Sequence, residues 1–246
     1  MAERKCCEIL GTSVLVTNME ETVRTIEHEL DELRGQYICV GNVHTTVMAH
    51  DDAHYRTVQD NAAFVLPDGK PLSVYSRKHG FPEAERVTGP DLMLALFSGE
   101  NGLRHYFYGS TKETLDLLEQ KLRERYPKLQ IAGMVSPPFR ALTGEEDAEE
   151  TEKINASGAD IIWVGLGAPK QENWMYEHRG KVNGVMIGVG AGFDYHAGNI
   201  KRAPMWMQKM SLEWLYRLLQ DPKRLFRRYL VTNFRYLWLI NRGKKK

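Results

Sequence analysis

Short apolar runs bounded by turn residues recur along residues 1–200, and each has the length of a buried strand. We expect strands over residues 14–16, 37–40, 63–66, 105–108, 131–135, 161–164 and 185–189. Between several of these runs, apolar residues return every three or four positions, which is the period of a helix. This period predicts helices over residues 20–33, 91–97 and 112–126, and a fourth near 146–155 after a turn-rich loop. Strands that alternate with helices predict an α/β fold with a mostly parallel, Rossmann-like sheet flanked by helices.

The pattern changes from Met205 onward, where helical periodicity continues without strands. Asp221 and Pro222 indicate a new helix there, because Asp favours the N-cap and Pro the first helical position. In the same way Thr17 and Glu20 fit a capping box at the start of the first long helix. The chain therefore divides into an α/β core over residues 1–200 and a helical appendage over residues 201–246.

Charge is divided at the same point. The whole chain has a net charge of +1, yet residues 201–246 hold 13 of the 33 Lys and Arg residues and only two acidic residues, Glu213 and Asp221. Tryptophan, tyrosine and phenylalanine are interleaved with these cations. The combination suits an anionic membrane surface, a nucleic acid or an acidic partner. A solvated basic tail is the simpler alternative.

Several classes of protein are disfavoured by what the chain contains. Cys6, Cys7 and Cys39 are too few and too irregularly spaced for a disulfide framework or a zinc site, so we expect a reducing, cytoplasmic environment. The first thirty residues lack the apolar core of a signal peptide, and no window has the length of apolar residues that a membrane span needs. The histidines have no metal-ligand spacing, so we expect no metal site.

Two glycine-rich segments, residues 161–172 and 185–194, each begin as an apolar strand and end in glycines followed by polar residues. A parallel strand of this kind delivers a loop to the carboxyl edge of the sheet, where α/β folds bind ligands. Neither segment matches the dinucleotide-binding or P-loop glycine pattern. The pair, with Gly190 in its second loop, indicates a nucleotide-type ligand without naming it.

Polar side chains follow several of the predicted strands. Asp68 directly follows the strand over 63–66, and a carboxylate there could deprotonate an attacking hydroxyl as a general base. A turn aspartate before Gly69 is the simpler alternative. Asn42 could bind a sugar or a base, or could be a turn residue only. Gln171 and Glu172 lie at a helix start, and Asp194 follows the second glycine turn, where it could bind a ribose or sugar hydroxyl.

Arginines supply the candidate anion-binding groups. Arg86 could meet a phosphate, or could form a surface salt bridge. In the helix that starts at Pro222, Arg224 precedes Arg227 by three positions and Arg228 by four, so the three side chains project from neighbouring positions. Such a cluster suits a diphosphate, with surface solvation as the alternative.

These residues together resemble a known family. The motifs that carry the resemblance lie at residues 67–69, 86–89, 167–172, 188–194, 202–204, 213–217, 221–224 and 227–229. In this order and combination they resemble the WecG/TagA/CpsF family of bacterial glycosyltransferases, over roughly residues 10–234.

The resemblance implies an inverting, metal-independent transferase that needs no cofactor and takes a UDP-sugar as co-substrate. The acceptor it implies is a sugar linked to undecaprenyl diphosphate at the inner face of the plasma membrane. The enzyme would then be cytoplasmic and peripheral on an anionic membrane surface, with a homo-oligomer as a possible state.

By the same motif matching, Asp68 takes the position of the catalytic base, and Asn42, Arg86 and Gln171 fall in the substrate pocket. Glu172, Gly190, Asp194 and Arg202 complete the expected substrate-binding set. Arg217, Arg224 and Arg227, with Arg228 beside them, are expected to meet the diphosphate of the lipid or of UDP. The arginine-rich appendage would close the site against the membrane.

One position departs from the family pattern. Members that use N-acetylmannosamine commonly have Thr two positions before the pocket Asn, where this chain has Val40. The missing hydroxyl removes one hydrogen bond to a sugar, so the donor sugar stays open. Two other functions also stay open: a non-catalytic regulator that binds a UDP-sugar, and a nucleic-acid-binding protein that uses the basic end. The glycine loops and Asp68 argue against nucleic acid.

Overall fold

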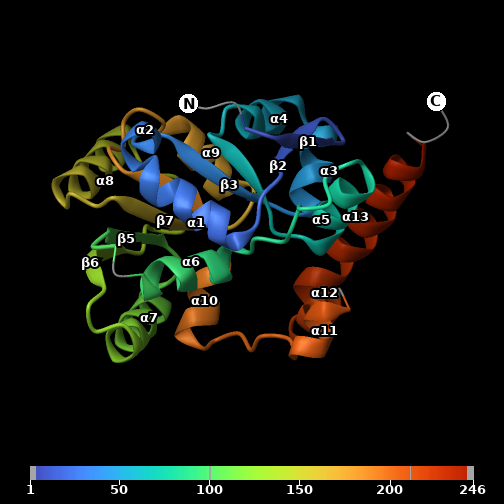
Figure 1. Cartoon of the computed structure of the whole chain (residues 1–246). Coiled ribbons are helices and arrows are strands. Elements are labelled where there is room, and N and C mark those ends of the chain that lie inside the picture. The colour runs from blue at the N-terminus through green and yellow to red at the C-terminus, as the bar shows by residue number, and fades with distance from the viewer. Residues whose placement is uncertain (1–3, 100, 211, 243–246) are drawn as a thin grey trace.

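An eight-stranded sheet, parallel except at one edge, lies at the centre of the protein (Figure 1). The structure, a computed structural model, describes residues 4–99, 101–210 and 212–242. The strands are β1 (Cys6–Ile9), β2 (Thr12–Leu15), β3 (Tyr37–Gly41), β4 (Phe64–Pro67), β5 (Arg104–Gly109), β6 (Gln130–Val135), β7 (Ile161–Gly165) and β8 (Val185–Gly188). Their order is β1-β2-β4-β3-β8-β7-β5-β6, and only β1 and β2 pair antiparallel. The predicted mostly parallel sheet is confirmed.

Helices cover both faces of this sheet. On one face are α1 (Met19–His28), α2 (Leu30–Leu33), α6 (Gly89–Ser98), α7 (Lys112–Arg125) and α10 (Gly192–Ala197). On the other are α3 (Val43–Asp51), α4 (Ala53–Asp60), α5 (Lys70–Lys78), α8 (Gly144–Ala156) and α9 (Lys170–Glu177). Side chains of β3 alternate between the two faces: Ile38 and Val40 face the first set, Tyr37 and Cys39 the second. Burial on both sides explains why the strands read as continuous apolar runs.

Every predicted strand is present, and the predicted helices near 91–97, 112–126 and 146–155 are confirmed as α6, α7 and α8. The helix predicted over residues 20–33 is broken at Glu29 into α1 and α2. Its predicted capping box at Thr17 and Glu20 is wrong by one residue. Asn18 is the N-cap, and its side chain accepts a hydrogen bond from the backbone N–H of Glu21.

β1 and the helices α3, α4, α5 and α10 were not predicted from the sequence. The apolar residues of α3 follow no helical period, because the helix lies between a strand end and another helix and is buried on several sides. β1 is short and edge-located, and only its pairing with β2 makes it a strand.

Three helices follow the core: α11 (Met205–Lys209), α12 (Glu213–Gln220) and α13 (Pro222–Arg242), which begins at Pro222 as predicted. Figure 1 shows α13 running alongside α3 and α5 at one side of the sheet. Tyr236 of α13 is 3% exposed and packs among core residues that include Ile9, Val14 and Leu72. Arg235 makes two hydrogen bonds to the carboxylate of Asp51, at 2.7 and 2.6 Å. These contacts fasten the middle of α13 to the core.

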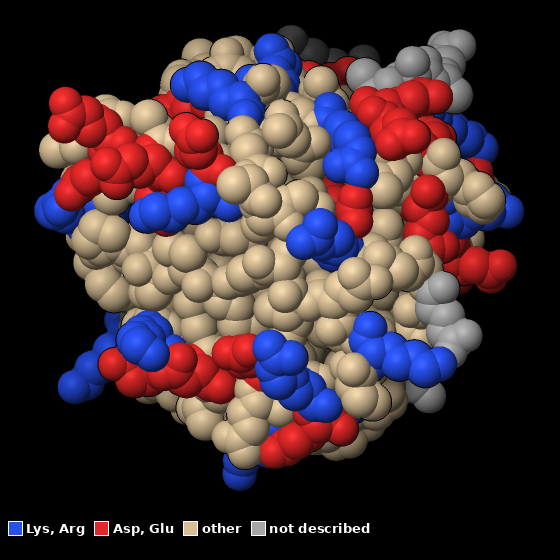
Figure 2. Space-filling model, turned by 90° about the vertical axis from the view of Figure 1, so that its left-hand side faces the viewer, with Lys and Arg blue, Asp and Glu red and all other residues tan. Residues whose placement is uncertain are grey.

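Acidic and basic side chains are interspersed on the side of the molecule that carries α7 and α8, opposite α13 (Figure 2). No single-sign patch dominates that view. None of the helices in the described part of the chain combines the length and apolar character that a membrane span requires.

Candidate functional site

A cavity of about 550 Å³ lies at the carboxyl ends of the adjacent strands β4, β3, β8 and β7. Asn42 follows β3, Asp68 follows β4, Gly167 lies just beyond β7, and Gly190 just beyond β8; all four line the cavity. The outer wall comes from α12 and α13. The cavity thus joins strand ends from the core to helices that follow it in the chain.

The backbone of the cavity wall contributes positive electrostatic potential, independently of the charged side chains. The first residues of α3, α5, α6 and α9, or the residues just before them, lie in its wall. α3, α5 and α9 each follow a strand end, and the residues before α6 return to the end of β4, where the N–H of Val87 donates to the carbonyl of Pro67. The four N-termini therefore lie at the carboxyl edge of the sheet. Free backbone N–H groups and the helix dipole make such N-termini favourable for anions. The site therefore favours a ligand that carries phosphate.

Asp68 lies in this wall with its backbone N–H bonded to the carbonyl of Gly41 at 2.8 Å. Within the described residues its carboxylate accepts no hydrogen bond. Burial raises the pKa of Asp68 to about 6; Arg86 and Arg217 oppose this rise, and Glu213 adds to it. A free carboxylate with a pKa near the physiological range can accept a proton from a ligand hydroxyl.

Asn42 is both a cavity residue and the N-cap of α3. Its Oδ1 accepts hydrogen bonds from the backbone N–H groups of His44 and Thr45, and the Thr45 hydroxyl accepts one from the N–H of Asn42. The cap fixes the side chain in one orientation. Its Nδ2 donates no hydrogen bond to any described residue, so this group can donate to a ligand.

Gln171 ties the two glycine loops together. Its Oε1 accepts hydrogen bonds from the N–H groups of Gly167 (3.1 Å) and Gly190 (3.0 Å), while its Nε2 donates to Oε1 of Glu172 (2.8 Å). Gly167 and Gly190 have φ values of +77° and +54°, a conformation that favours glycine. Glu172 is 1% exposed, and it lines the cavity together with Gln171. The amide of Gln171 therefore shapes the loops in this structure.

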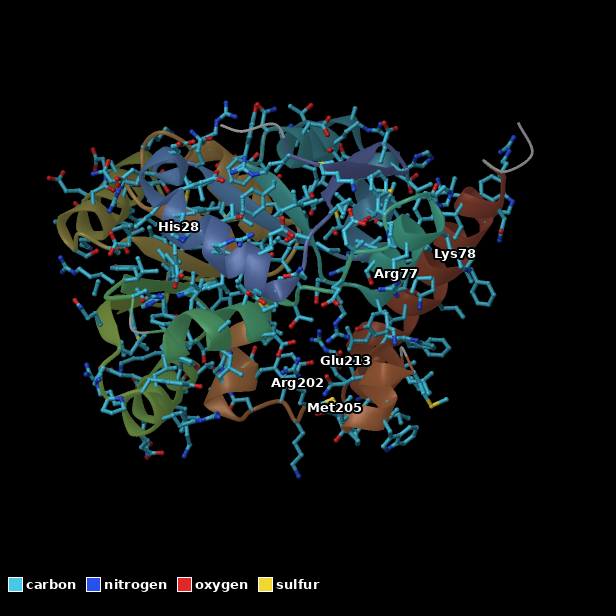
Figure 3. All side chains as sticks on the ribbon, viewed as in Figure 1. His28, Arg77, Lys78, Arg202, Met205 and Glu213 are labelled. Carbon is cyan, nitrogen blue, oxygen red and sulfur yellow. The ribbon has the colours of Figure 1, made fainter. Side chains whose placement is uncertain are left out.

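The arginines of the cavity are held by carboxylates or aromatic rings. Arg86 donates to Glu213 of α12 at 2.8 Å, and Arg202 makes two hydrogen bonds to Asp91 of α6. The guanidinium of Arg217 lies over the ring of Tyr195, 5.5 Å from its centroid. Figure 3 shows Arg202 and Glu213 where the core faces α11 and α12. The predictions for Arg224, Arg227 and Arg228 fall on side chains outside the described part.

Asp194 is the one predicted site residue with a described side chain that the structure does not bring into the cavity wall. It lies in α10, where its carboxylate is 3.4 Å from Nδ2 of Asn199 and its carbonyl accepts from Asn199 and Ile200. The next residue, Tyr195, lines the cavity instead. A single position along a helix turns the side chain to another side, and the strand-end rule could not resolve this.

Several cavity residues were not selected from the sequence: Thr88, Tyr195, Glu213, Trp214, Tyr229 and Asn233. Thr88, Glu213, Trp214 and Tyr229 lie inside recognised motifs, so the motifs were a usable signal for these four residues. Tyr229 and Asn233 lie on α13, and only the packing of α13 against α3 brings them to the cavity. Among the described residues, no group of three or more His, Cys, Asp or Glu side chains is placed to hold a metal ion.

Comparison with known proteins adds to this geometry. Residues 7–246 match the family described as the glycosyl transferase WecG/TagA/CpsF family. The chain belongs to this family. The match includes the strand ends, the glycine loops and all of α11–α13, and it confirms the resemblance found in the sequence motifs.

Three relatives carry the same name, N-acetylglucosaminyldiphosphoundecaprenol N-acetyl-beta-D-mannosaminyltransferase. One from Bacillus spizizenii is 33% identical over 83% of this chain and 79% of its own length. One from Bacillus subtilis is 30% identical over 89% and 85%, and one from Staphylococcus aureus is 28% identical over 97% and 93%. Membership in the family establishes a glycosyltransferase.

Proposed function

We propose that this protein transfers a sugar from a UDP-sugar to a sugar carried on a polyprenyl diphosphate, with Asp68 as the general base. The observation that carries the proposal is the carboxylate of Asp68, which accepts no hydrogen bond from any described residue, has a raised pKa, and lies in a cavity lined by arginines and helix N-termini. The relatives' names indicate N-acetylmannosamine as the sugar and an N-acetylglucosaminyl-diphosphoundecaprenol as the acceptor.

In the proposed reaction a hydroxyl oxygen of the acceptor sugar attacks the anomeric carbon of the donor. The new C–O bond forms as the bond from that carbon to the diphosphate of UDP breaks, and the hydroxyl proton passes to Asp68. A single displacement of this kind inverts the configuration at the anomeric carbon. The transfer leaves UDP with one more negative charge than it had in the donor.

That charge needs stabilisation in the transition state, and fixed positive groups supply it most effectively. Arg86, Arg202 and Arg217 line the cavity together with the N-termini of α6 and α9. We assign these groups to the diphosphate of the donor or of the acceptor. They provide the electrostatic role that a bound metal plays in other transferases, so the proposed reaction needs no metal.

Val40 lies in the cavity wall two positions before Asn42. It offers no hydrogen bond to a sugar, so donor selectivity in this chain rests more heavily on Asn42 and on shape. For this reason the donor test must include several UDP-sugars rather than one.

The acceptor places the enzyme at a membrane surface in this proposal. Large apolar side chains of α11–α13 are exposed, among them Trp206, Phe226 and Phe234, and arginines are interleaved with them. Exposed aromatics with cations suit the interface of an anionic bilayer. We infer a peripheral attachment through these helices.

The proposal is tested by measuring UDP release from a panel of UDP-sugars, with a short-chain lipid-diphosphate N-acetylglucosamine as acceptor. Wild-type protein should release UDP from one donor far faster than from the others, and only with acceptor present. Asp68→Asn should lower kcat by about a thousandfold, the usual range for a general base. Asp194→Asn, a change outside the cavity wall, should lower kcat by less than tenfold.

Donor binding without any release, from a folded wild-type protein, would indicate the non-catalytic regulator instead. Comparable rates for Asp68→Asn and Asp194→Asn would exclude Asp68 as the base while leaving the transferase itself intact.

A further inference from the structure

The cavity has a polar side and an apolar side. The polar side carries Asp68, Asn42 and the arginines at the strand ends. The apolar side lies between α3, α12 and α13, and its lining residues are Val43, Trp214, Leu225, Tyr229, Tyr236 and Leu237. The diphosphate and the two sugars of the proposed reaction need polar partners, whereas this wall offers mainly apolar surface and so suits an apolar group of a ligand.

This wall is built from packed side chains. Leu225 and Tyr236 are each 3% exposed, and Trp214 meets Tyr229 edge-on with ring centroids 6.0 Å apart. The hydroxyl of Thr232 on α13 lies 3.5 Å from Nδ1 of His44 on α3, which joins the two helices beside the cavity. Contacts between side chains of α3, α12 and α13 therefore form this wall in the structure.

The wall continues to the outer surface of the protein. Leu237 lines the cavity and is also 52% exposed, and its neighbours Phe234 and Trp238 on α13 are exposed as well. An apolar path therefore runs from the cavity along α13 to the outside. Arg217 lies at the inner, polar part of the same cavity.

We propose that this apolar wall is a subsite for the first isoprenoid units of the acceptor lipid. The lipid diphosphate would then lie toward Arg217, and the chain would leave the cavity past Leu237 to the membrane. A polyprenyl diphosphate has one anionic end and one apolar end, which matches the cationic and apolar sides of a single cavity. The inference rests on the proposed function, since it names where the acceptor of that reaction is held.

A matched pair of leucines on α13 separates this subsite from general attachment to a membrane. Leu237 lines the cavity, whereas Leu230 does not, and the two are similarly exposed at 52% and 47%. Leu237→Ser and Leu230→Ser remove the same apolar group from the same helix. If the leucines served only in membrane attachment, both changes would have the same effect.

The experiment is a calorimetric titration of the full chain, without membranes, with inorganic diphosphate, isopentenyl diphosphate and farnesyl diphosphate. Wild-type protein should bind farnesyl diphosphate about tenfold or more tightly than isopentenyl diphosphate, because the longer chain buries more apolar surface. Leu237→Ser should lose most of this gain, and Leu230→Ser should keep it. Affinity for inorganic diphosphate should be the same in all three proteins.

Equal affinity for the three ligands, no binding of any of them, or equal losses in the two variants would overturn the subsite. The UDP-release assay described above tests the proposed function independently of these binding measurements. Sugar transfer without a chain-length gain would refute the subsite alone, whereas a chain-length gain without transfer would refute the proposed function and leave an isoprenoid diphosphate site.

Discussion

The sheet core buries its large apolar side chains, whereas α11–α13 expose theirs. Of the large apolar residues that are exposed among the described ones, only Leu117 and Phe139 lie outside residues 205–242. No described residue of α12 is buried. The core is thus stabilised by its own packing, and the C-terminal helices are fastened to it at a few points and leave their apolar surface to an external partner.

Three of the four points of attachment include residues of the cavity wall. Tyr236 enters the core cluster, Arg235 binds Asp51, Arg202 binds Asp91, and Glu213 binds Arg86. The last two pairs join the segment before α11 to α6, and α12 to the loop between α5 and α6. The strand-end part of the site therefore belongs to the packed sheet core. The part formed by α12 and α13 is held to that core by a few contacts.

The largest expected effect is from removing the C-terminal helices by truncation after Gly198. Sugar transfer should be abolished, because Arg202, Arg217 and the outer wall of the cavity are lost. The core should remain folded, since its clusters are mostly its own, but it should unfold at a lower temperature without the cover of Tyr236. Activity assays with circular dichroism measure both. An unfolded product would show that residues 1–200 are not an independent core.

Tyr236→Ala should lower the free energy of unfolding by about 3 kcal/mol, because it leaves a cavity where an aromatic ring was packed. Tyr236→Phe is the matched control. Within the described residues the buried hydroxyl of Tyr236 has no hydrogen-bond partner, so its removal should be neutral or slightly stabilising. Urea denaturation compares the two variants. Equal losses would place the contribution in the hydroxyl rather than in the ring.

His105 should make the stability of the core sensitive to acid. Burial lowers the pKa of His105 to about 4, and its Nδ1 accepts a hydrogen bond from Trp163. Neutral His105 therefore contributes its full share to the free energy of unfolding above the ordinary histidine pKa. As pH falls from about 6.5 to 4, the free energy of unfolding should drop by about 2–3 kcal/mol. Urea denaturation at several pH values should show this loss in wild type, and a smaller one in His105→Asn. The same slope in both proteins would exclude His105 as its origin.

Asp68 should act on stability with the opposite sign. The pKa of Asp68 is raised to about 6 in the folded protein, so the folded state favours the protonated carboxyl. The stabilisation from this group is therefore complete below the ordinary aspartate pKa and is lost as pH rises through 6. Partial solvent access limits the effect to about 1–2 kcal/mol. Asp68→Asn should therefore be more stable than wild type at pH 8 and no more stable near pH 4. Thermal unfolding at the two pH values tests this, and equal stability at pH 8 would contradict the buried charge.

The smallest expected effect is from Glu213→Gln. A partly exposed ion pair contributes about 1 kcal/mol or less, so the loss of the bond to Arg86 should change global stability little. It should nevertheless loosen α12 and raise the KM of the donor several-fold. Arg86→Gln combined with Glu213→Gln gives the coupling between the two residues. Additive effects in this double-mutant cycle would show that the ion pair does not connect the two regions.

Much of the core could be predicted from the sequence, because strands and helices leave local periodic patterns. Each parallel strand delivers its following residue to the same edge of the sheet, so Asn42, Asp68 and the glycine loops could be placed together without coordinates. Helices without an apolar period, such as α3, could not be predicted, because they leave no such local pattern. Their burial is set by neighbours far along the chain.

The sequence alone determined the alternation of strands and helices, the residues at the strand ends, and the break in charge and pattern near residue 201. Only the tertiary structure decided which of those residues share a cavity. It turned Asp194 away, directed Gln171 to the glycine loops, and brought Glu213 to Arg86 and Leu237 to the cavity wall. The physical reason is that periodicity is a property of neighbouring residues. Contacts between segments that are separated along the chain, from the 19 positions between Gln171 and Gly190 to the 127 between Arg86 and Glu213, depend on strand order and helix packing, which no local pattern encodes.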